Sequence, residues 1–140
     1  MENQICAYIK DKINIDNVST VYYSSQLFKF SSMFKISLCY IERCFLMVSD
    51  KKSFLELKFM SVAKVFSSSN LNTDWELEVV KAAERWLCHK RNERTKYAKY
   101  LLLKTRLSLL SDSALNYIKD KVLCFKRNGM VMVMVSLRKL

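Results

Sequence analysis

The sequence predicts an all-α fold built of stacked antiparallel helical hairpins. Proline is absent and the single glycine is Gly129, so the residues that break helices and form tight turns are almost missing. Apolar residues make up 51% of the chain and recur at the three- and four-residue intervals of a buried helix face. With 140 residues, the chain is long enough for about one domain with its own core.

Three amphipathic helices are expected in the first third of the chain. The first covers residues 2–14, in which isoleucines recur every fourth residue and lysines lie off that stripe. Asp16 or Asn17 can cap the second helix, because short polar side chains accept hydrogen bonds from the first backbone amides. Ser31 or Ser32 can cap the third in the same way. Connections of a few residues make consecutive helices antiparallel neighbours, so helical hairpins are predicted here.

Two short helices are expected in the middle of the chain, beyond the polar residues 49–53. The first begins at Phe54, and the second contains Val62 and Phe66. Residues 67–70 are three serines and an asparagine, whose side chains hydrogen-bond to nearby backbone and compete with helix formation. This run therefore predicts a loop between helices.

The clearest helix start lies at Thr73, which Glu76 follows at the three-residue spacing of a capping box. Val79, Ala82 and Trp86 then recur on one face of the expected helix. The small alanine lets a neighbouring helix approach, while the indole of Trp86 fills a wider gap. We therefore expect Trp86 to belong to the core rather than to a binding surface.

Two more helices are expected in the last part of the chain. Glu93 and Arg94 open the first of them, with apolar residues following on one side. Ser111 or Ser113 can cap the second. Pattern alone thus predicts about eight helices, with uncertain boundaries.

The end of the sequence differs in character from the rest. From residue 125 on, a turn dipeptide containing the single glycine precedes an unbroken run of methionine and valine, which is a strand-like composition. We predict a helical domain over residues 1–124 and a non-helical or disordered tail over residues 125–140.

The run of residues 65–76 carries a specific motif. It consists of two apolar residues, three serines, an asparagine, then Leu71 and Asn72, and it ends on Glu76. This run resembles the BACK domain of BTB-Kelch proteins, whose pattern is two apolar residues, two serines and an aspartate, any residue, then leucine, asparagine, valine and a nearby glutamate. Ser69 stands where the family has aspartate, and Thr73 where it has valine. Both replacements preserve the register of the motif.

The resemblance is strongest over residues 54–110 and continues along the expected helices. Another departure is Thr105, which stands where the family has valine. The resemblance implies a mainly structural role for the matching positions. These are Leu71, Asn72, Glu76, Val79, Ala82, Trp86, Arg94 and Arg106.

The resemblance implies a function in ubiquitin ligation. In BTB-Kelch proteins the BTB domain dimerises and grips a cullin, the Kelch domain holds the substrate, and the BACK domain is the helical spacer between them. Such a protein is a substrate adaptor of a cullin-RING ubiquitin ligase, and the spacer positions the substrate for ubiquitination. The sequence has no membrane-spanning run and no basic-then-apolar order typical of a signal peptide, so we expect a cytoplasmic or nuclear protein.

Residues 1–47 resemble the helices that follow the BTB domain and contribute to cullin binding. On these helices the candidate partner contacts are Tyr8, Lys12 and Tyr22. The sequence contains neither a recognisable BTB domain nor a Kelch repeat, so we expect a fragment or a short isoform. Its binding to a cullin is expected to be weak without the BTB domain, because a partial groove buries little area.

Arg94 and Arg106 allow two interpretations. They can contact a partner domain, or their guanidinium groups can bridge helix ends and backbone carbonyls between neighbouring hairpins. The second interpretation is favoured, because the planar fork of arginine suits partly buried, bidentate contacts.

The net charge of +11 supports an alternative function. Clustered lysine and arginine favour phosphate binding, so the chain could be a stand-alone basic helical module that binds nucleic acid or an acidic protein. The basic residues are, however, spread along the chain in short doublets, which solvated helix faces explain. Nucleic acid is therefore the less favoured partner.

No catalytic, metal or cofactor site is predicted. The only histidine, His89, has no acidic residue at a spacing that would orient it as a base. It also adjoins Cys88, and neighbouring residues on a helix point about 100° apart, which disfavours a zinc site there. No apolar run approaches the roughly 20 residues of a membrane-spanning helix. We expect neither an enzyme nor a membrane partner.

Overall fold

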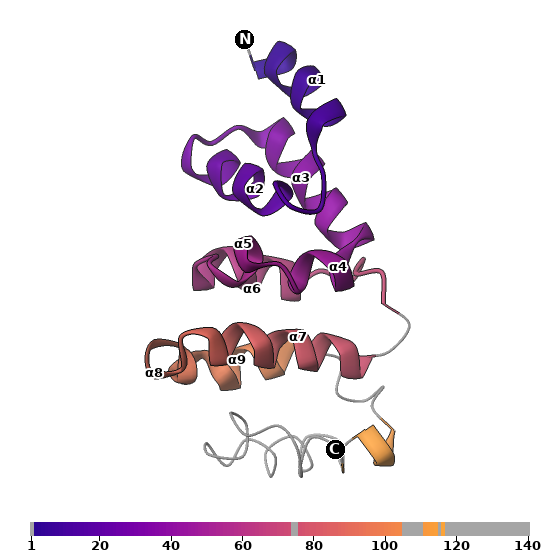
Figure 1. Ribbon diagram of the computed structural model, residues 1–140, viewed down its shortest axis with the longest axis vertical. Helices are drawn as coiled ribbons and strands as arrows, with labels where there is room; N and C mark the ends of the chain where they lie inside the picture. Colours follow the sequence, from indigo (N-terminus) through magenta and orange to yellow (C-terminus); the bar gives the residue numbers. More distant parts are fainter. Residues whose placement is uncertain (1, 74–75, 105–110, 115, 117–140) are drawn as a thin grey trace. The chain divides into compact units, whose positions relative to one another are not determined.

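The regular elements of the described part of the computed structural model are all helices (Figure 1), which confirms the predicted all-α fold class. The structure describes residues 2–73, 76–104, 111–114 and 116. The predicted domain end at residue 124 and the predicted tail, residues 125–140, lie outside the described residues. The chain divides into two compact units, Met1–Asn72 and Thr73–Leu140.

The first unit begins with three helices, α1 Glu2–Lys12, α2 Val18–Leu27 and α3 Ser31–Arg43. Helices α2 and α3 pack along each other as a hairpin, as predicted (Figure 1). In the short turn between them Lys29 adopts a φ of 57°, in the left-handed region that residues with a Cβ rarely occupy. The backbone amide of Phe30 then donates to the carbonyl oxygen of Ser25 at 2.9 Å and closes the turn.

The starts of α2 and α3 differ from the sequence prediction. Asn17 precedes α2 but makes no capping bond with its side chain. Its Oδ1 instead accepts a hydrogen bond from the backbone amide of Asn14 at 2.8 Å, so the local turn competes successfully for this oxygen. For α3 the residue before the helix is Phe30, and Ser31 is already helical. The predicted capping by Asp16 or Asn17 and by Ser31 or Ser32 is therefore wrong.

Three short helices complete the first unit, α4 Phe45–Ser49, α5 Lys52–Leu55 and α6 Phe59–Phe66. The two short helices expected around Phe54 and Val62 are thus confirmed. Phe45, Phe54 and Phe66 meet edge to face, with ring centroids 5.7 to 6.5 Å apart, and each is fully or almost fully buried. This arrangement of aromatic quadrupoles holds α4, α5 and α6 together.

The second unit contains α7 Glu76–His89, α8 Arg91–Arg94, the 3-10 helix η1 Thr95–Tyr97 and α9 Ala98–Lys104. Helices α7 and α9 lie side by side (Figure 1). The apolar face of α7 is buried along its length, and Ala98 and Leu101 of α9 are buried too. The expected core face of α7 is therefore confirmed.

The helix predicted to open at Glu93 and Arg94 is divided into α8, η1 and α9 in the structure. The hydroxyl of Thr95 donates a hydrogen bond to the carbonyl oxygen of Arg91, four residues back. Threonine that bonds back in this way bends a helix, which accounts for the 3-10 turn at this point. The single long helix of the prediction is therefore wrong.

The helix expected after Ser111 is present in the described residues, where residues 112–114 and 116 are helical. The backbone amide of Ala114 donates to the Ser111 Oγ at 3.2 Å. This is the bond that an N-cap serine makes with the third helical residue, so the predicted cap at Ser111 is confirmed.

Candidate interaction site

Arg94 is buried, with 5% of its surface exposed, and it lies against Trp86. Its Nη1 donates a hydrogen bond to the carbonyl oxygen of Trp86 at 2.6 Å. The Arg94 Cζ also lies 4.0 Å from the centroid of the Trp86 ring system, within the range of a cation–π interaction. Arg94 thus bridges a helix carbonyl and an aromatic face inside its unit, and Trp86 itself is 1% exposed, as expected of a core residue.

Leu71 and Asn72 fasten the loop after α6 to the end of α3. Leu71 is buried, and the backbone amide of Asn72 donates to the carbonyl oxygen of Glu42 at 2.8 Å. The side-chain Nδ2 of Asn72 donates to the carbonyl oxygen of Arg43 at 3.1 Å. These bonds satisfy carbonyls in the last turn of α3, which have no partner within the helix. The predicted loop is therefore a well-fastened connection.

The other family positions have different outcomes. Val79 and Ala82 are buried on α7. Glu76 is the first residue of α7, but residues 74–75 lie outside the described residues, so its capping box with Thr73 stays a prediction. Arg106 also lies outside the described residues.

The three candidate partner contacts differ in exposure. Tyr8 is 68% exposed on α1, with the Lys12 Nζ 5.8 Å from the centroid of its ring. Tyr22 is fully buried, and its hydroxyl donates to the carbonyl oxygen of Ser61 at 3.0 Å. Burial, together with the nearby charge of Glu42, raises the pKa of Tyr22 well above its usual value. Tyr22 exposes no surface to a partner, so this candidate contact is wrong.

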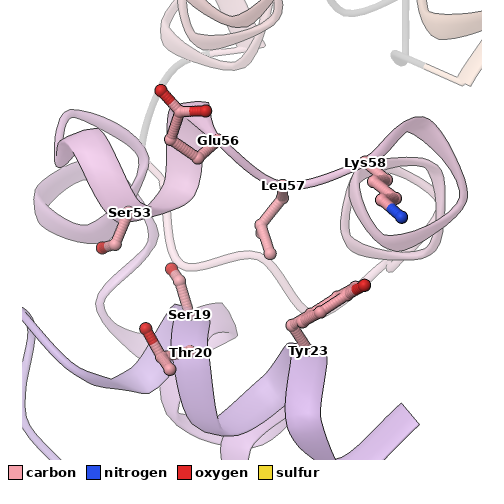
Figure 2. Close-up of a pocket in the computed structure, with 7 residues that line it drawn as sticks. All are labelled: Ser19, Thr20, Tyr23, Ser53, Glu56, Leu57 and Lys58. Atoms are coloured by element: carbon pink, nitrogen blue, oxygen red, sulfur yellow. The ribbon is translucent and has the colours of Figure 1, made fainter. Parts of the chain in front are cut away.

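A pocket of about 290 Å³ opens between α2 and the segment that joins α5 to α6 (Figure 2). Its lining combines hydroxyl groups, one aromatic ring and two opposite charges. The lining residues are Ser19, Thr20, Tyr23, Ser53, Glu56, Leu57 and Lys58. The sequence does not reveal this pocket, because its two walls are 30 or more residues apart in the chain and no spacing pattern relates them.

The described residues show no site for metal chemistry. No group of three or more histidine, cysteine, aspartate or glutamate side chains within them could hold a metal ion. Nor does any helix in the described ranges have the length and apolar character to cross a bilayer.

Comparison with known families gives a match that covers most of the chain. The model of the BACK family, described as "BTB And C-terminal Kelch", matches residues 18–119. The chain belongs to the BACK family. The resemblance seen in the sequence motif is therefore confirmed, and the strongest part of it, residues 54–110, lies inside the matched range.

Curated relatives of this BACK chain are Kelch and BTB proteins. Kelch repeat and BTB domain-containing protein 3 of Homo sapiens is 29% identical over 108 residues, which are 77% of this chain and 18% of that protein. Kelch repeat and BTB domain-containing protein 2 of Homo sapiens is 28% identical over 105 residues, which are 75% of this chain and 17% of that protein. The chain spans less than a fifth of the length of these relatives.

The match to the BACK family covers most of the contacts described above. It contains α2 to α9 and therefore both walls of the pocket. It also contains the Arg94–Trp86 and Asn72–Arg43 contacts, which bind parts of the fold to one another. Helix α1, with the exposed Tyr8, precedes the matched range. In this BACK chain the described family positions Leu71, Val79, Ala82, Trp86 and Arg94 are buried and pack within the two units.

Proposed function

We propose that this BACK chain is the helical spacer of a substrate adaptor for a cullin-RING ubiquitin ligase, acting in the cytoplasm or nucleus. The observation that carries the proposal is the BACK match over residues 18–119. Relatives whose names contain both Kelch repeat and BTB domain support it. In adaptors of this family the BTB domain binds the cullin and the Kelch domain holds the substrate. The spacer sets the distance between them.

A spacer works only if each of its parts is stiff, because a substrate lysine must be held close to the ubiquitin-charged enzyme. The contacts within each unit meet this requirement. In the first unit, the three phenylalanines of α4, α5 and α6 meet edge to face, and Asn72 fastens the loop to α3. In the second, Arg94 joins α8 to α7 through Trp86. The proposed role is therefore mechanical positioning rather than catalysis.

The proposed cullin contact lies on α1. Tyr8 is largely exposed there, and Lys12 lies over its ring, so one face of the helix presents an aromatic surface with a positive charge. Exposed tyrosines of this kind are common anchors in protein interfaces. Because α1 alone offers little area, the contact is expected to be weak unless a BTB domain adds to it.

The test is a pulldown of the 140-residue chain with a cullin N-terminal domain, compared with the same chain fused behind a BTB domain. We expect the fusion to retain the cullin and the chain alone to retain less of it. Tyr8→Ala in the fusion should reduce retention, whereas Tyr100→Ala, an exposed tyrosine of α9, should not. Failure of the fusion to bind a cullin would refute the adaptor role.

A second candidate function is a basic interaction module that binds nucleic acid or an acidic protein. It is favoured by the net charge of +11 and by lysines that lie over accessible aromatic rings, such as Lys12 over Tyr8 and Lys104 over Tyr100. Aromatic and basic groups together can stack on bases and contact phosphates. A nucleic-acid binder should lose affinity steeply as salt rises, whereas cullin binding should depend on salt only modestly.

A further inference from the structure

The pocket between α2 and the α5–α6 segment has a polar end that contains an unsatisfied hydroxyl. Ser19 is fully buried, and its Oγ has no hydrogen-bond partner among the described residues. Buried hydroxyls are normally paired, and an unpaired one costs free energy. Thr20, one residue further on α2, adds a second hydroxyl on the same side of the pocket in Figure 2. This end can therefore donate hydrogen bonds to a carbonyl oxygen of a ligand.

The opposite end of the pocket is aromatic and positively charged. The Lys58 Nζ lies 5.8 Å from the centroid of the Tyr23 ring, and Figure 2 shows both side chains on the side away from Ser19 and Ser53. Leu57 lies between the two ends and is buried, with 5% exposure. A ligand with an apolar stem and an anionic tip matches this order, because the stem can cover Leu57 and Tyr23 while the tip pairs with Lys58.

Glu56 and Lys58 give the two ends of the pocket opposite charges. In Figure 2 its side chain lies on the side of Ser53, while Lys58 lies on the side of Tyr23. A negative charge near Glu56 is repelled, and a negative charge near Lys58 is attracted. An acidic side chain entering the pocket is therefore oriented with its carboxylate toward Lys58.

The α5 side of the pocket is held in place by contacts with Asp16, which does not line the pocket. The Ser53 Oγ donates to the carbonyl oxygen of Asp16 at 3.3 Å, and the Lys51 Nζ pairs with the Asp16 carboxylate at 3.1 Å. These contacts link α5 to the turn before α2. The volume of about 290 Å³ is at the lower limit of the roughly 300–1,000 Å³ typical of small-molecule pockets. A preformed pocket of this size suits one or two side chains of a peptide.

We propose that this pocket binds a short acidic segment of a partner protein, whose glutamate side chain lies over Leu57 and Tyr23 with its carboxylate on Lys58. The backbone carbonyl of the segment accepts from Ser19 and Thr20 at the polar end. The net charge of +11 favours such a partner, because long-range attraction speeds the encounter with an acidic chain. This inference goes beyond the proposed spacer function and does not depend on the cullin contact of α1.

The test uses fluorescence anisotropy with the full chain and a fluorescein-labelled decapeptide of alternating glutamate and glycine. A peptide with glutamine in place of glutamate is the matched ligand control. We expect the glutamate peptide to bind at least about fivefold more tightly, and Lys58→Gln to weaken its binding by a similar factor. Glu56→Gln should strengthen binding, because it removes a repulsive charge.

Lys64→Gln is the matched protein control. Lys64 is also an exposed lysine over an aromatic ring, with its Nζ 5.1 Å from the Phe34 centroid, but it lines a different pocket. Its substitution should change affinity by less than about twofold, as expected of a screened surface charge. Equal losses of affinity for the glutamate peptide in Lys58→Gln and Lys64→Gln would show that the peptide is attracted by the overall charge of the chain rather than by this pocket, and would overturn the proposal. Equal binding of the two peptides would overturn it as well.

Ser19→Ala separates a binding role from a structural role. The hydroxyl has no hydrogen-bond partner within the described part of the chain, so its removal should leave the melting temperature unchanged or higher. It should weaken binding of the glutamate peptide by about threefold if the hydroxyl bonds to the ligand. Unchanged affinity would remove Ser19 from the site, and a lowered melting temperature would assign it to the fold. A DNA oligonucleotide is tested in the same assay. If the wild type binds it more tightly than it binds the glutamate peptide, and Lys58→Gln abolishes that binding, the pocket is a nucleic-acid site and the proposal is overturned.

Discussion

The hydroxyl of Tyr22 donates a hydrogen bond to the carbonyl oxygen of Ser61 at 3.0 Å, although the two residues are 39 positions apart in the chain. The bond joins α2 to α6 inside the first unit, and both residues are buried. The Tyr22 ring also stacks on Phe34 of α3, with ring centroids 5.4 Å apart. One side chain thus ties together three helices that periodicity alone places only approximately.

Tyr22→Phe should destabilise the protein by about 0.5–1.5 kcal/mol, because it removes one buried hydrogen bond and keeps the ring packing. The free energy of unfolding, measured by urea titration with circular dichroism, gives the value. Tyr23→Phe is the control on the same helix, since the Tyr23 side chain is only half-buried and should change stability by less than about 0.5 kcal/mol. Equal effects of the two substitutions would contradict the special role of Tyr22.

Stability should also fall at high pH because of Tyr22. Its pKa in the folded state is raised by burial and by the nearby Glu42, while the unfolded chain releases the phenolic proton near pH 10. The folded state therefore holds a proton that the unfolded state loses. The contribution of Tyr22 is fully present below about pH 10 and declines as the pH rises toward the folded pKa.

Urea titrations of wild type and Tyr22→Phe from pH 8 to pH 11 test this expectation. The stability advantage of wild type should be constant below about pH 10 and should shrink above it, by up to about 1.4 kcal/mol per pH unit. Lysines and other tyrosines titrate in both proteins, so the difference isolates Tyr22. A difference that stays constant up to pH 11 would show that the folded pKa is not raised.

Substitutions of Asn72 should follow a fixed order of stability. Asn72→Ala removes the Nδ2 donor to the Arg43 carbonyl and should cost about 0.5–1 kcal/mol, since the residue is exposed. Asn72→Asp should cost more, because it also places a negative charge at the negative end of the α3 dipole. Thermal unfolding of both variants gives the order. Asn70→Asp is the control for an added negative charge in the same loop. A loss of stability in Asn70→Asp as large as that in Asn72→Asp would show that the charge acts independently of its position at the end of α3.

Arg94→Lys should destabilise the second unit by about 1–3 kcal/mol, although the charge is kept. A lysine cannot reproduce both the hydrogen bond to the Trp86 carbonyl and the planar contact with its ring. Arg91→Lys is the control, because Arg91 is half-buried and makes a long hydrogen bond to the Cys88 sulfur at 3.6 Å. Chemical denaturation followed by tryptophan fluorescence measures both. Equal stability of Arg94→Lys and wild type would show that charge alone matters at this position.

The sequence predicted those parts of the fold that depend on local pattern. The apolar face of α7 followed from the spacing of Val79, Ala82 and Trp86, and the cap at Ser111 followed from its residue type and position. The loop of residues 67–70 followed from side chains that bond to nearby backbone. Each of these features is decided within about two helical turns of sequence.

Features that depend on distant residues were missed or misassigned. Tyr22 was expected at a partner surface, since periodicity does not show that a carbonyl oxygen 39 residues away accepts a hydrogen bond from its hydroxyl. The pocket was missed because Ser19 and Lys58 line the same pocket only after the chain folds. The division at Thr95 was missed because threonine is compatible with a helix until its hydroxyl bonds to the backbone of the preceding turn.

Glu76→Ala should cost about 1 kcal/mol if Glu76 forms the predicted capping box with Thr73. In such a box the Glu76 side chain accepts from the Thr73 amide, and glutamine can do the same. Glu76→Gln should therefore retain most of the stability and lose only the favourable interaction of a negative charge with the start of α7. Glu78→Ala is the control, because Glu78 pairs with Lys81 on the helix surface at 3.2 Å and its loss should cost less than about 0.5 kcal/mol. Urea titrations of the three variants measure the loss of unfolding free energy in each. Equal losses for Glu76→Ala and Glu76→Gln would show that only the charge of Glu76 stabilises the helix. A loss for Glu76→Ala no larger than that for Glu78→Ala would rule out the capping box.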